Sequence, residues 1–210
     1  MKKMLTILLT LVFALTLNAQ PSKEYINDSF ETVSKEVGIE VLLLKSVCWV
    51  ESHHRPYAYR HSDAPGGVNA LGMCQLLYST AKGLGLEDEK CKRDFSNFSK
   101  SERKYSACKL FGPETNIRYA AIYLKSLLKK YNGNEYKAVL SYNAGRYVEC
   151  ENGWLHAYLP DDNGNYHRQK FKRCLKGGPV NMYYAHNVTS AMDIFFDKTP
   201  EVRDTISLLP

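Results

Sequence analysis

The sequence predicts a mainly α-helical fold in a single domain, and three observations lead to this class. Apolar residues recur at helical spacing in several separate segments between positions 26 and 196. Glycines such as Gly38, Gly133 and Gly145 stand where these periodic segments end, as they do at helix C-termini. About 190 residues remain once the leader described below is set aside, which is enough for one domain with a real core.

Two helices are expected first along the chain. The segment 26–37 is amphipathic, and Gly38 can stop it. Its inward face would combine Ile26, Phe30, Val33 and Val37. The segment 41–52 is apolar on nearly all sides, which predicts a central buried helix. Pro56 and the Gly- and Pro-containing cluster 61–67 then mark a loop.

Three further helices are expected after this loop. The segment 116–130 has the clearest period, with Asn116 as its expected N-cap and Gly133 as its closing residue. Its inward face would combine Ile117, Ala121, Leu124, Leu128 and Tyr131. A short helix is expected at 136–142, broken at Gly145, and a last one at 180–196. The inward residues of the last helix would be Tyr184, Val188, Ala191, Met192 and Phe195.

Two polar segments interrupt this helical pattern. The segment 86–110 is rich in Lys, Asp and Ser, and the segment 146–178 contains the turn-forming clusters 160–164 and 177–179. We expect both to be irregular. Long loops in compact domains are often functional, although surface decoration explains them equally well.

The N-terminus predicts export. Lys2 and Lys3 precede an uncharged apolar stretch at 4–17, and Asn18-Ala19 supply a small residue at a cleavage point. This is the pattern of a secretory signal peptide at 1–19, and its apolar region is short for a membrane span. We therefore expect an exported protein, periplasmic or associated with the cell wall, with no membrane span after cleavage. An uncleaved anchor is the alternative.

The mature chain would then have three parts. An N-terminal segment at 20–25 leads into one domain at 26–196, and a C-terminal tail follows at 197–210.

The charge balance narrows the class of partner. The formal net charge is +6, and it falls to +4 when the leader leaves with its two lysines and no acid. A mildly basic surface suits an anionic polymer. No basic run with interleaved aromatics is present, and export also argues against a nucleic-acid partner.

All six cysteines lie in the expected mature chain. An even number of cysteines in an exported protein favours disulfides, and six cysteines allow fifteen connectivities. Zinc is disfavoured because no close Cys-x-x-Cys pair occurs. His53, His54 and His61 lack the i, i+4 spacing of a metalloprotease helix, so we expect no metal.

Glu51 is the most informative residue because it ends the apolar segment 41–52. A carboxyl group at such a place can keep its proton near neutral pH, because burial disfavours the ionised form. The segments 70–76, 116–124 and 142–145 follow and carry Gln, Asn and Tyr side chains, which can hydrogen-bond sugar hydroxyls and acetamido groups. One proton-donating acid among polar amides and aromatics is the chemistry of glycosidic bond cleavage.

These segments carry a resemblance to a known family. The ordered motifs that resemble the soluble lytic transglycosylase family are Glu51-Ser52, Gly72-Met73-Cys74-Gln75, Asn116-Ile117, Tyr123-Leu124 and Tyr142-Asn143-Ala144-Gly145. Members of this family are goose-lysozyme-like enzymes that cleave the glycan strands of peptidoglycan. The resemblance runs from about Ile26 to about Phe196. It implies a lysozyme-like (goose-type) single domain with long surface loops stapled by disulfides, acting without a cofactor.

The resemblance also suggests a disulfide pattern. Cys91–Cys108 and Cys150–Cys174 are favoured, because each pair would close a segment that looks inserted relative to the family. Cys48 and Cys74 are left over, and both sit beside site motifs.

The resemblance implies a mechanism that uses one acid. Glu51 first protonates the leaving glycosidic oxygen, while the N-acetyl group of the substrate stabilises the sugar cation. The Glu51 carboxylate then takes the proton of the C6 hydroxyl of the same N-acetylmuramic acid (MurNAc). That hydroxyl attacks C1 and closes a 1,6-anhydro ring, because a tethered nucleophile can outcompete water.

The resemblance carries over further residues as substrate-binding. Gln75, Tyr123, Tyr142 and Asn143 match family positions that hold sugar or orient the acid. Met73 and Cys74 stand where the family often has Leu-Met. Tyr184 resembles a late Tyr-Val pattern that closes the cleft, and Tyr183 would fill this position after a one-residue slip. Ser62 is a candidate for a family serine, in a loop longer than usual.

Three functions remain in competition at this point. The first is a lytic transglycosylase acting as a monomer on peptidoglycan glycan strands, with N-acetylglucosamine (GlcNAc) on the far side of the cleaved bond. The second is a hydrolytic goose-type muramidase, for which Asp63 would be the nearest second acid. The third is a non-catalytic wall-binding or assembly factor of a secretion or conjugation machine. The lack of an obvious second carboxylate favours the lyase, and an intact Glu51 argues against the non-catalytic factor.

Overall fold

The structure is a computed structural model of the chain. It describes residues 20–61, 69–151, 154–160, 166–173, 178–179 and 182–196. The expected signal peptide and C-terminal tail lie outside these ranges, as do Ser62, Asp63 and Cys174.

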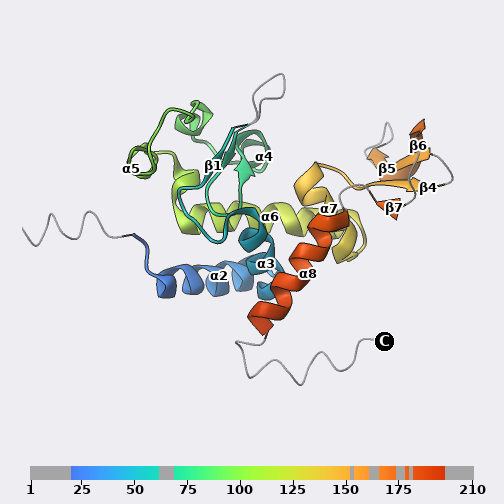
Figure 1. Cartoon of the computed structure of the whole chain (residues 1–210), viewed down its shortest axis with the longest axis horizontal. Helices are drawn as coiled ribbons and strands as arrows, with labels where there is room; N and C mark the ends of the chain where they lie inside the picture. Colours follow the sequence, from blue (N-terminus) through green and yellow to red (C-terminus); the bar gives the residue numbers. More distant parts are fainter. Residues whose placement is uncertain are drawn as a thin grey trace, which may run out of the picture.

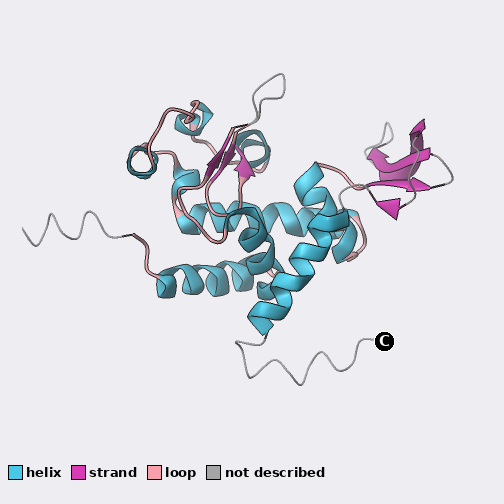
Figure 2. Ribbon diagram, viewed as in Figure 1, coloured by secondary structure: helices cyan, strands magenta, loops and turns pink. Residues whose placement is uncertain are grey.

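Within the described ranges, five longer helices build the body of the protein (Figures 1 and 2). They are α2 (Lys23–Val37), α3 (Val41–Ser52), α6 (Pro113–Lys130), α7 (Glu135–Ala144) and α8 (Met182–Phe196). The helix α3 contacts α2, α6 and α8, so it occupies the centre of this body, as its apolar sequence predicted. The expectation of a mainly α fold is confirmed.

The ends of these helices follow ordinary capping rules. α2 begins one turn earlier than expected, because the Ser22 side chain accepts a hydrogen bond from the backbone N–H of Tyr25. It ends at Gly38, which has a φ of 70°. α3 begins after Glu40, whose carboxylate accepts hydrogen bonds from the first backbone N–H groups of the helix.

The start of α6 corrects one expectation. Asn116 is not the N-cap, because the helix begins at Pro113 after Gly112. Proline suits the first helical position, where its fixed φ is already helical and its missing N–H has no partner to lose. Asn116 is instead fully buried, and its amide hydrogen-bonds the backbone around the 72–75 turn.

A small sheet lies over one end of α6. It joins β1 (Tyr59–Arg60), β2 (Ala70–Leu71) and β3 (Leu76–Leu77) in antiparallel order. The short helix α4 (Tyr78–Gly83) follows at once. This sheet places the 72–75 turn next to the end of α3.

The segment 86–110 is more ordered than expected. It contains η1 (Glu89–Lys92), α5 (Lys100–Lys104) and the start of η2 (Lys109–Phe111), where η marks a 3-10 helix. The expected disulfide Cys91–Cys108 is present and joins η1 to the residue before η2. Phe95 is fully buried against Phe98 and Phe111, so the segment has a small core of its own.

The expectation of an irregular 146–178 segment is wrong. It forms β4 (Val148–Glu151), β5 (Trp154–Pro160), β6 (Tyr166–Arg173) and β7 (Gly178–Pro179) in the order β6-β5-β4-β7. The Asn163-Gly164 pair lies between β5 and β6, which is a signal for an antiparallel hairpin. Figure 1 shows this sheet beyond α7, away from α2 and α5.

A second disulfide, Cys48–Cys74, joins α3 to the 72–75 turn. Cys174 lies outside the described residues, so the expected Cys150–Cys174 pair stays a prediction. Among the described helices, none is both long and apolar enough to cross a bilayer.

Candidate active site

Glu51 lies in the last turn of α3 and is partly buried. Its Oε1 accepts a hydrogen bond of 2.7 Å from the hydroxyl of Tyr184 on α8. The side chain of Asn143, at the end of α7, also hydrogen-bonds this carboxyl. Three helices far apart in sequence therefore meet at one acid.

The surroundings of Glu51 favour its protonated form. Burial raises the pKa of the Glu51 carboxyl, and this effect outweighs the lowering by the Tyr184 hydrogen bond, the Arg60 charge and the Asn143 hydrogen bond. A carboxyl with a raised pKa can donate a proton near neutral pH. Tyr184 can still stabilise the carboxylate that remains after the proton has left, because its hydroxyl is a donor.

The 72–75 turn is fastened to the end of α3 by two bonds. The Ser52 hydroxyl donates a hydrogen bond of 2.5 Å to the carbonyl oxygen of Met73. The disulfide Cys48–Cys74 makes a second link, one turn before Glu51. The position of Glu51 relative to this turn is therefore fixed by both a covalent and a hydrogen-bonded contact.

Asn116 holds the same turn from the side of α6. Its Oδ1 accepts from the backbone N–H of Cys74 at 2.7 Å, and its Nδ2 donates to the carbonyl oxygens of Leu71 and Leu110, each at 2.9 Å. Gly72 has a φ of 75°, and a side chain there would collide with the Asn116 amide and the Leu110 carbonyl. The motif residues Gly72 and Asn116 thus act together in shaping the turn.

Gln75 and Asn143 both lie close to Glu51. Gln75 borders the same hollow as Glu51 and donates a hydrogen bond of 2.9 Å to the Gly72 carbonyl oxygen. Its φ of 49° is unusual for a residue with a side chain, so the turn holds it in a strained conformation. Tyr184 is buried and contacts Glu51, whereas the neighbouring Tyr183 is 78% exposed.

Other expected sugar contacts need correction. Met73 is fully buried in the main core, so its side chain is not available to a sugar. Tyr142 is also buried, and its hydroxyl donates to the carbonyl oxygen of Cys74 at 2.9 Å. The half-buried Tyr123 packs its ring 5.2 Å from that of Tyr142. Met73 and Tyr142 support the turn from behind, because the helical core encloses them. Ser62 lies outside the described residues.

A hollow of about 460 Å³ opens beside Glu51. Its walls come from the end of α3, the residues 55–60 and α5. Four cationic residues line it: Arg55, Arg60, Lys100 and Arg103. Reading the sequence missed these residues, because basic residues scattered over two loops resemble an ordinary solvated surface.

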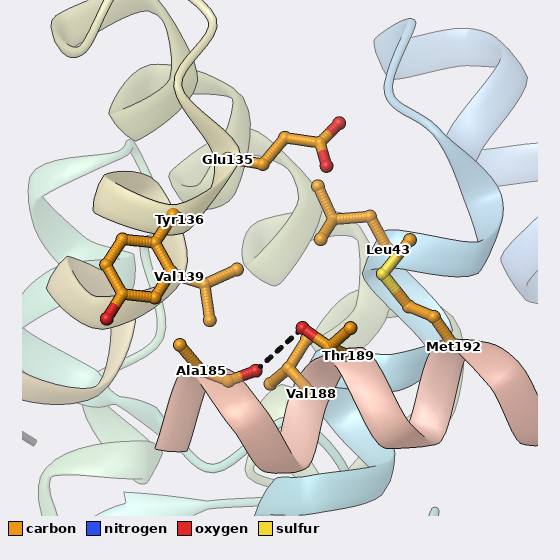
Figure 3. A pocket seen from close by; sticks show the side chains of 8 residues that line it. All are labelled: Leu43, Glu135, Tyr136, Val139, Ala185, Val188, Thr189 and Met192. Atoms are coloured by element: carbon orange, nitrogen blue, oxygen red, sulfur yellow. Dashed lines mark hydrogen bonds between the residues drawn. The ribbon is translucent and has the colours of Figure 1, made fainter. Parts of the chain in front are cut away.

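Two other hollows lie away from Glu51. One of them, between α7 and α8, is lined mainly by apolar side chains with Glu135 at its edge (Figure 3). The other lies between α2, α3 and α8 and includes Trp49 and Phe195. Neither hollow is lined by Glu51 or by its partners Tyr184 and Asn143.

The described residues offer one cluster with the spacing of metal ligands, formed by Asp88, Cys91 and Cys108. Its two cysteines are joined in the disulfide, so their sulfurs do not act as thiolate ligands. His54 places its Nε2 2.8 Å from the carbonyl oxygen of Lys45. His61 places its Nδ1 3.0 Å from Asn69 Oδ1.

Comparison with known proteins identifies the family. Residues 28–152 match the family described as Transglycosylase SLT domain. The chain belongs to this family. The resemblance drawn from the Glu51, Gly72–Gln75, Asn116 and Tyr142 motifs is thereby confirmed.

Curated relatives of this SLT-domain protein are longer than the chain. It is 32% identical over 133 residues to the peptidoglycan transglycosylase gp16 of Escherichia phage T7, which covers 63% of this chain and 8% of that protein. It is 28% identical over 116 residues to the membrane-bound lytic murein transglycosylase E of Buchnera aphidicola, covering 55% of this chain and 45% of that protein. It is 29% identical over 119 residues to the membrane-bound lytic murein transglycosylase C of Sodalis glossinidius, covering 53% of this chain and 29% of that protein.

The chain is also similar to a solved structure. It is an inactive mutant of the lytic transglycosylase Slt from Pseudomonas aeruginosa, with 20% identity and a TM-score of 0.49. The match covers 81% of this chain and 24% of the other.

Proposed function

We propose that this SLT-domain protein is a peptidoglycan lytic transglycosylase, which cleaves the MurNAc-β-1,4-GlcNAc bond without water and leaves 1,6-anhydroMurNAc ends. The observation that carries the proposal is the state of Glu51. It is a partly buried acid with a raised pKa, held by Tyr184 and Asn143 at the edge of an open hollow. The names of the curated relatives, which are peptidoglycan or murein transglycosylases, point to the same substrate.

The first chemical step needs a proton donor. Glu51 gives its proton to the glycosidic oxygen as the bond from this oxygen to C1 of MurNAc breaks. The N-acetyl group of the same sugar stabilises the cation at C1. The raised pKa of Glu51 favours the protonated form that this step needs.

The second step needs a base, and the same residue supplies it. The Glu51 carboxylate, stabilised by the hydrogen bond from Tyr184, accepts the proton of the C6 hydroxyl. The C6 oxygen then bonds to C1 and closes the anhydro ring. Intramolecular attack is favoured because the nucleophile is already tethered beside the cation.

The make-up of the hollow favours the lyase over a hydrolytic muramidase. A hydrolase that uses two carboxylates needs one to donate a proton and one to activate water. Glu51 is the one acid among the described residues that line this hollow. Asp63 lies outside the described residues, so the Asp63→Asn variant tests whether it takes part in hydrolysis.

A non-catalytic wall-binding role fits this site less well. A binding protein has no use for an acid whose pKa is raised by burial, because burying a carboxyl without a role costs stability. We further propose, from the N-terminal sequence, that the protein is exported and works in the periplasm or at the cell wall.

The proposal is tested by digestion of purified peptidoglycan with the wild-type protein and with Glu51→Gln. Gln is nearly isosteric with Glu but cannot donate and recover a proton. We expect 1,6-anhydroMurNAc ends from the wild type and none from the variant, as detected by mass spectrometry. Equal turnover by the two proteins would remove Glu51 from the mechanism. Asp63→Asn, in the same assay, should keep full activity.

A further inference from the structure

The hollow beside Glu51 has a strongly basic wall. Arg55 and Arg60 come from the loop and strand after α3, and Lys100 and Arg103 come from α5. Glu51 is the one acid among its described lining residues. The described ion pairs of the chain join other residues, so none of these four cations forms an ion pair with a described carboxylate, although the charge of Arg60 acts on Glu51.

Two of these cations are held in place by the backbone. Arg103 donates from its guanidinium to the carbonyl oxygens of Tyr57 and Phe98, and the group lies 5.9 Å from the centre of the Tyr59 ring. Arg55 donates from Nε to the carbonyl oxygen of Ser52 at 2.7 Å. Both charges are therefore ordered before a ligand arrives, which lowers the entropy lost on binding.

The segment that carries α5 is anchored rather than loose. Ser99 and Glu102 form a reciprocal capping box, which fixes the start of α5 next to Lys100. Phe95 packs against Phe98 and Phe111, and the ring of Tyr59 lies 6.1 Å from that of Phe95. The Cys91–Cys108 disulfide closes the base of the segment. An anchored segment can hold Lys100 and Arg103 against the hollow.

We propose that this basic wall is an anion subsite that binds a carboxylate carried by the glycan strand next to the cleaved bond. The inference rests on the proposed function, because it names part of the substrate of that same site. Ordered guanidinium groups suit carboxylates, which they bind with paired charge-assisted hydrogen bonds. The hollow, at about 460 Å³, is within the size range of ligand sites.

Two carboxylates on peptidoglycan fit this chemistry. One is the lactyl carboxylate of MurNAc, which is free in strands without peptides. The other is a carboxylate of the stem peptide, which is attached through that lactyl group. GlcNAc carries no charge, so a subsite for carboxylates would select strands by the substituent on MurNAc.

The test uses three glycan substrates and two charge variants. The substrates are peptide-free strands, the same strands with the lactyl carboxyl converted to a methylamide, and strands bearing stem peptides. The variants are Lys100→Gln and the control Lys92→Gln, which removes an exposed charge from the same segment but away from the hollow. Arg103 is left intact because its backbone hydrogen bonds also support the loop.

We expect wild-type protein to prefer carboxylate-bearing strands over methylamide strands in kcat/KM. Lys100→Gln should reduce the ratio of the two kcat/KM values, carboxylate strand over methylamide strand, by roughly fivefold, as loss of one solvent-accessible ion contact does. Lys92→Gln should leave this ratio at the wild-type value. A preference for peptide-free strands over their methylamides assigns the lactyl carboxylate. A preference seen only with peptide-bearing strands assigns the stem peptide. Equal kcat/KM for all three substrates would overturn the subsite.

Binding by Glu51→Gln protein separates this inference from the proposed function. If the wild type yields no anhydro ends, but Glu51→Gln binds carboxylate strands more tightly than methylamide strands, the reaction is wrong and the subsite stands. If cleavage occurs and binding shows no difference, the reaction stands and the subsite is wrong.

Discussion

Tyr184 donates a hydrogen bond of 2.7 Å to Glu51 across a separation of 133 residues in the sequence. It ties α8, near the C-terminus, to the acid on the central helix α3. The tyrosine is itself buried, and burial together with the nearby Glu51 charge raises its pKa well above the ordinary value, so it acts as a donor throughout the working pH range. Glu51, the proposed catalytic acid, therefore gains this hydrogen bond only when α8, the last described helix, has packed.

Tyr184→Phe should lower kcat by roughly tenfold or more, because it removes a hydrogen bond to a charged group. The same bond lowers the pKa of Glu51, so its loss should raise that pKa further. The alkaline limb of the kcat profile should therefore move to higher pH. Tyr183→Phe, at the exposed neighbouring position, is the matched control and should change neither quantity. An unmoved alkaline limb in Tyr184→Phe would count against this role.

Glu51→Gln should raise the melting temperature at pH 8 but not at pH 4. The folded pKa of Glu51 lies above its unfolded value, so its favourable contribution is full below that unfolded value, near 4.5, and is lost as the pH rises through the folded pKa. A neutral amide avoids this loss. Each kcal/mol gained should appear as about 2–4 °C in the melting temperature.

Calorimetry at the two pH values checks this expectation. Glu87→Gln, at an exposed position, provides the control and should show little change at either pH. A variant less stable than the wild type at pH 8 would contradict the account of an acid whose ionised form is disfavoured by burial.

The two disulfides should differ in what their loss does to catalysis. Removing either pair by double alanine substitution should cost about 3 kcal/mol of stability, given loops of 26 and 17 residues. Loss of Cys48–Cys74 should also reduce kcat, because it frees the turn that carries Gln75 from the helix that carries Glu51. Loss of Cys91–Cys108 should mainly raise KM, because it loosens the segment that carries α5.

Thermal unfolding and steady-state kinetics on the two double variants separate these effects. The same change in kcat for both pairs would show that the Cys48–Cys74 bond has no special part in placing the acid.

Asn116→Ala should destabilise the protein by about 3 kcal/mol, because one buried amide makes three hydrogen bonds and leaves their partners unsatisfied. Asn134→Ala serves as the comparison, since Asn134 is the exposed N-cap of α7 and its loss should cost about 1 kcal/mol. Chemical denaturation measures both. Equal losses would mean that the Asn116 contacts contribute little beyond helix capping.

The sequence was sufficient to predict those parts of the structure that a local pattern of residues determines. The apolar run at 41–52 became the central α3, and Gly38 and Gly145 end α2 and α7 in the left-handed conformation. The acid and its partner Tyr184 were identified through family motifs, and the structure places them in contact.

The sequence was not sufficient where contacts between residues far apart in the chain determine the structure. Asn116 looks like an N-cap, but its amide bonds to residues 42 and 45 positions earlier, which no local pattern can show. Met73 lies in a site motif, yet the packing of α3 and α6 encloses it. The cations Arg60 and Lys100 belong to separate segments, and only the fold brings them to one hollow.

The most direct test of the central claim is digestion of peptidoglycan in water enriched in heavy oxygen, followed by mass spectrometry of the new ends. If Glu51 works alone, the C6 hydroxyl quenches the cation and water never bonds to C1. The account therefore predicts 1,6-anhydroMurNAc ends that carry no heavy oxygen and are lighter than hydrolytic ends by one water molecule. Reducing ends labelled at C1 as the main product would contradict it and identify the protein as a muramidase.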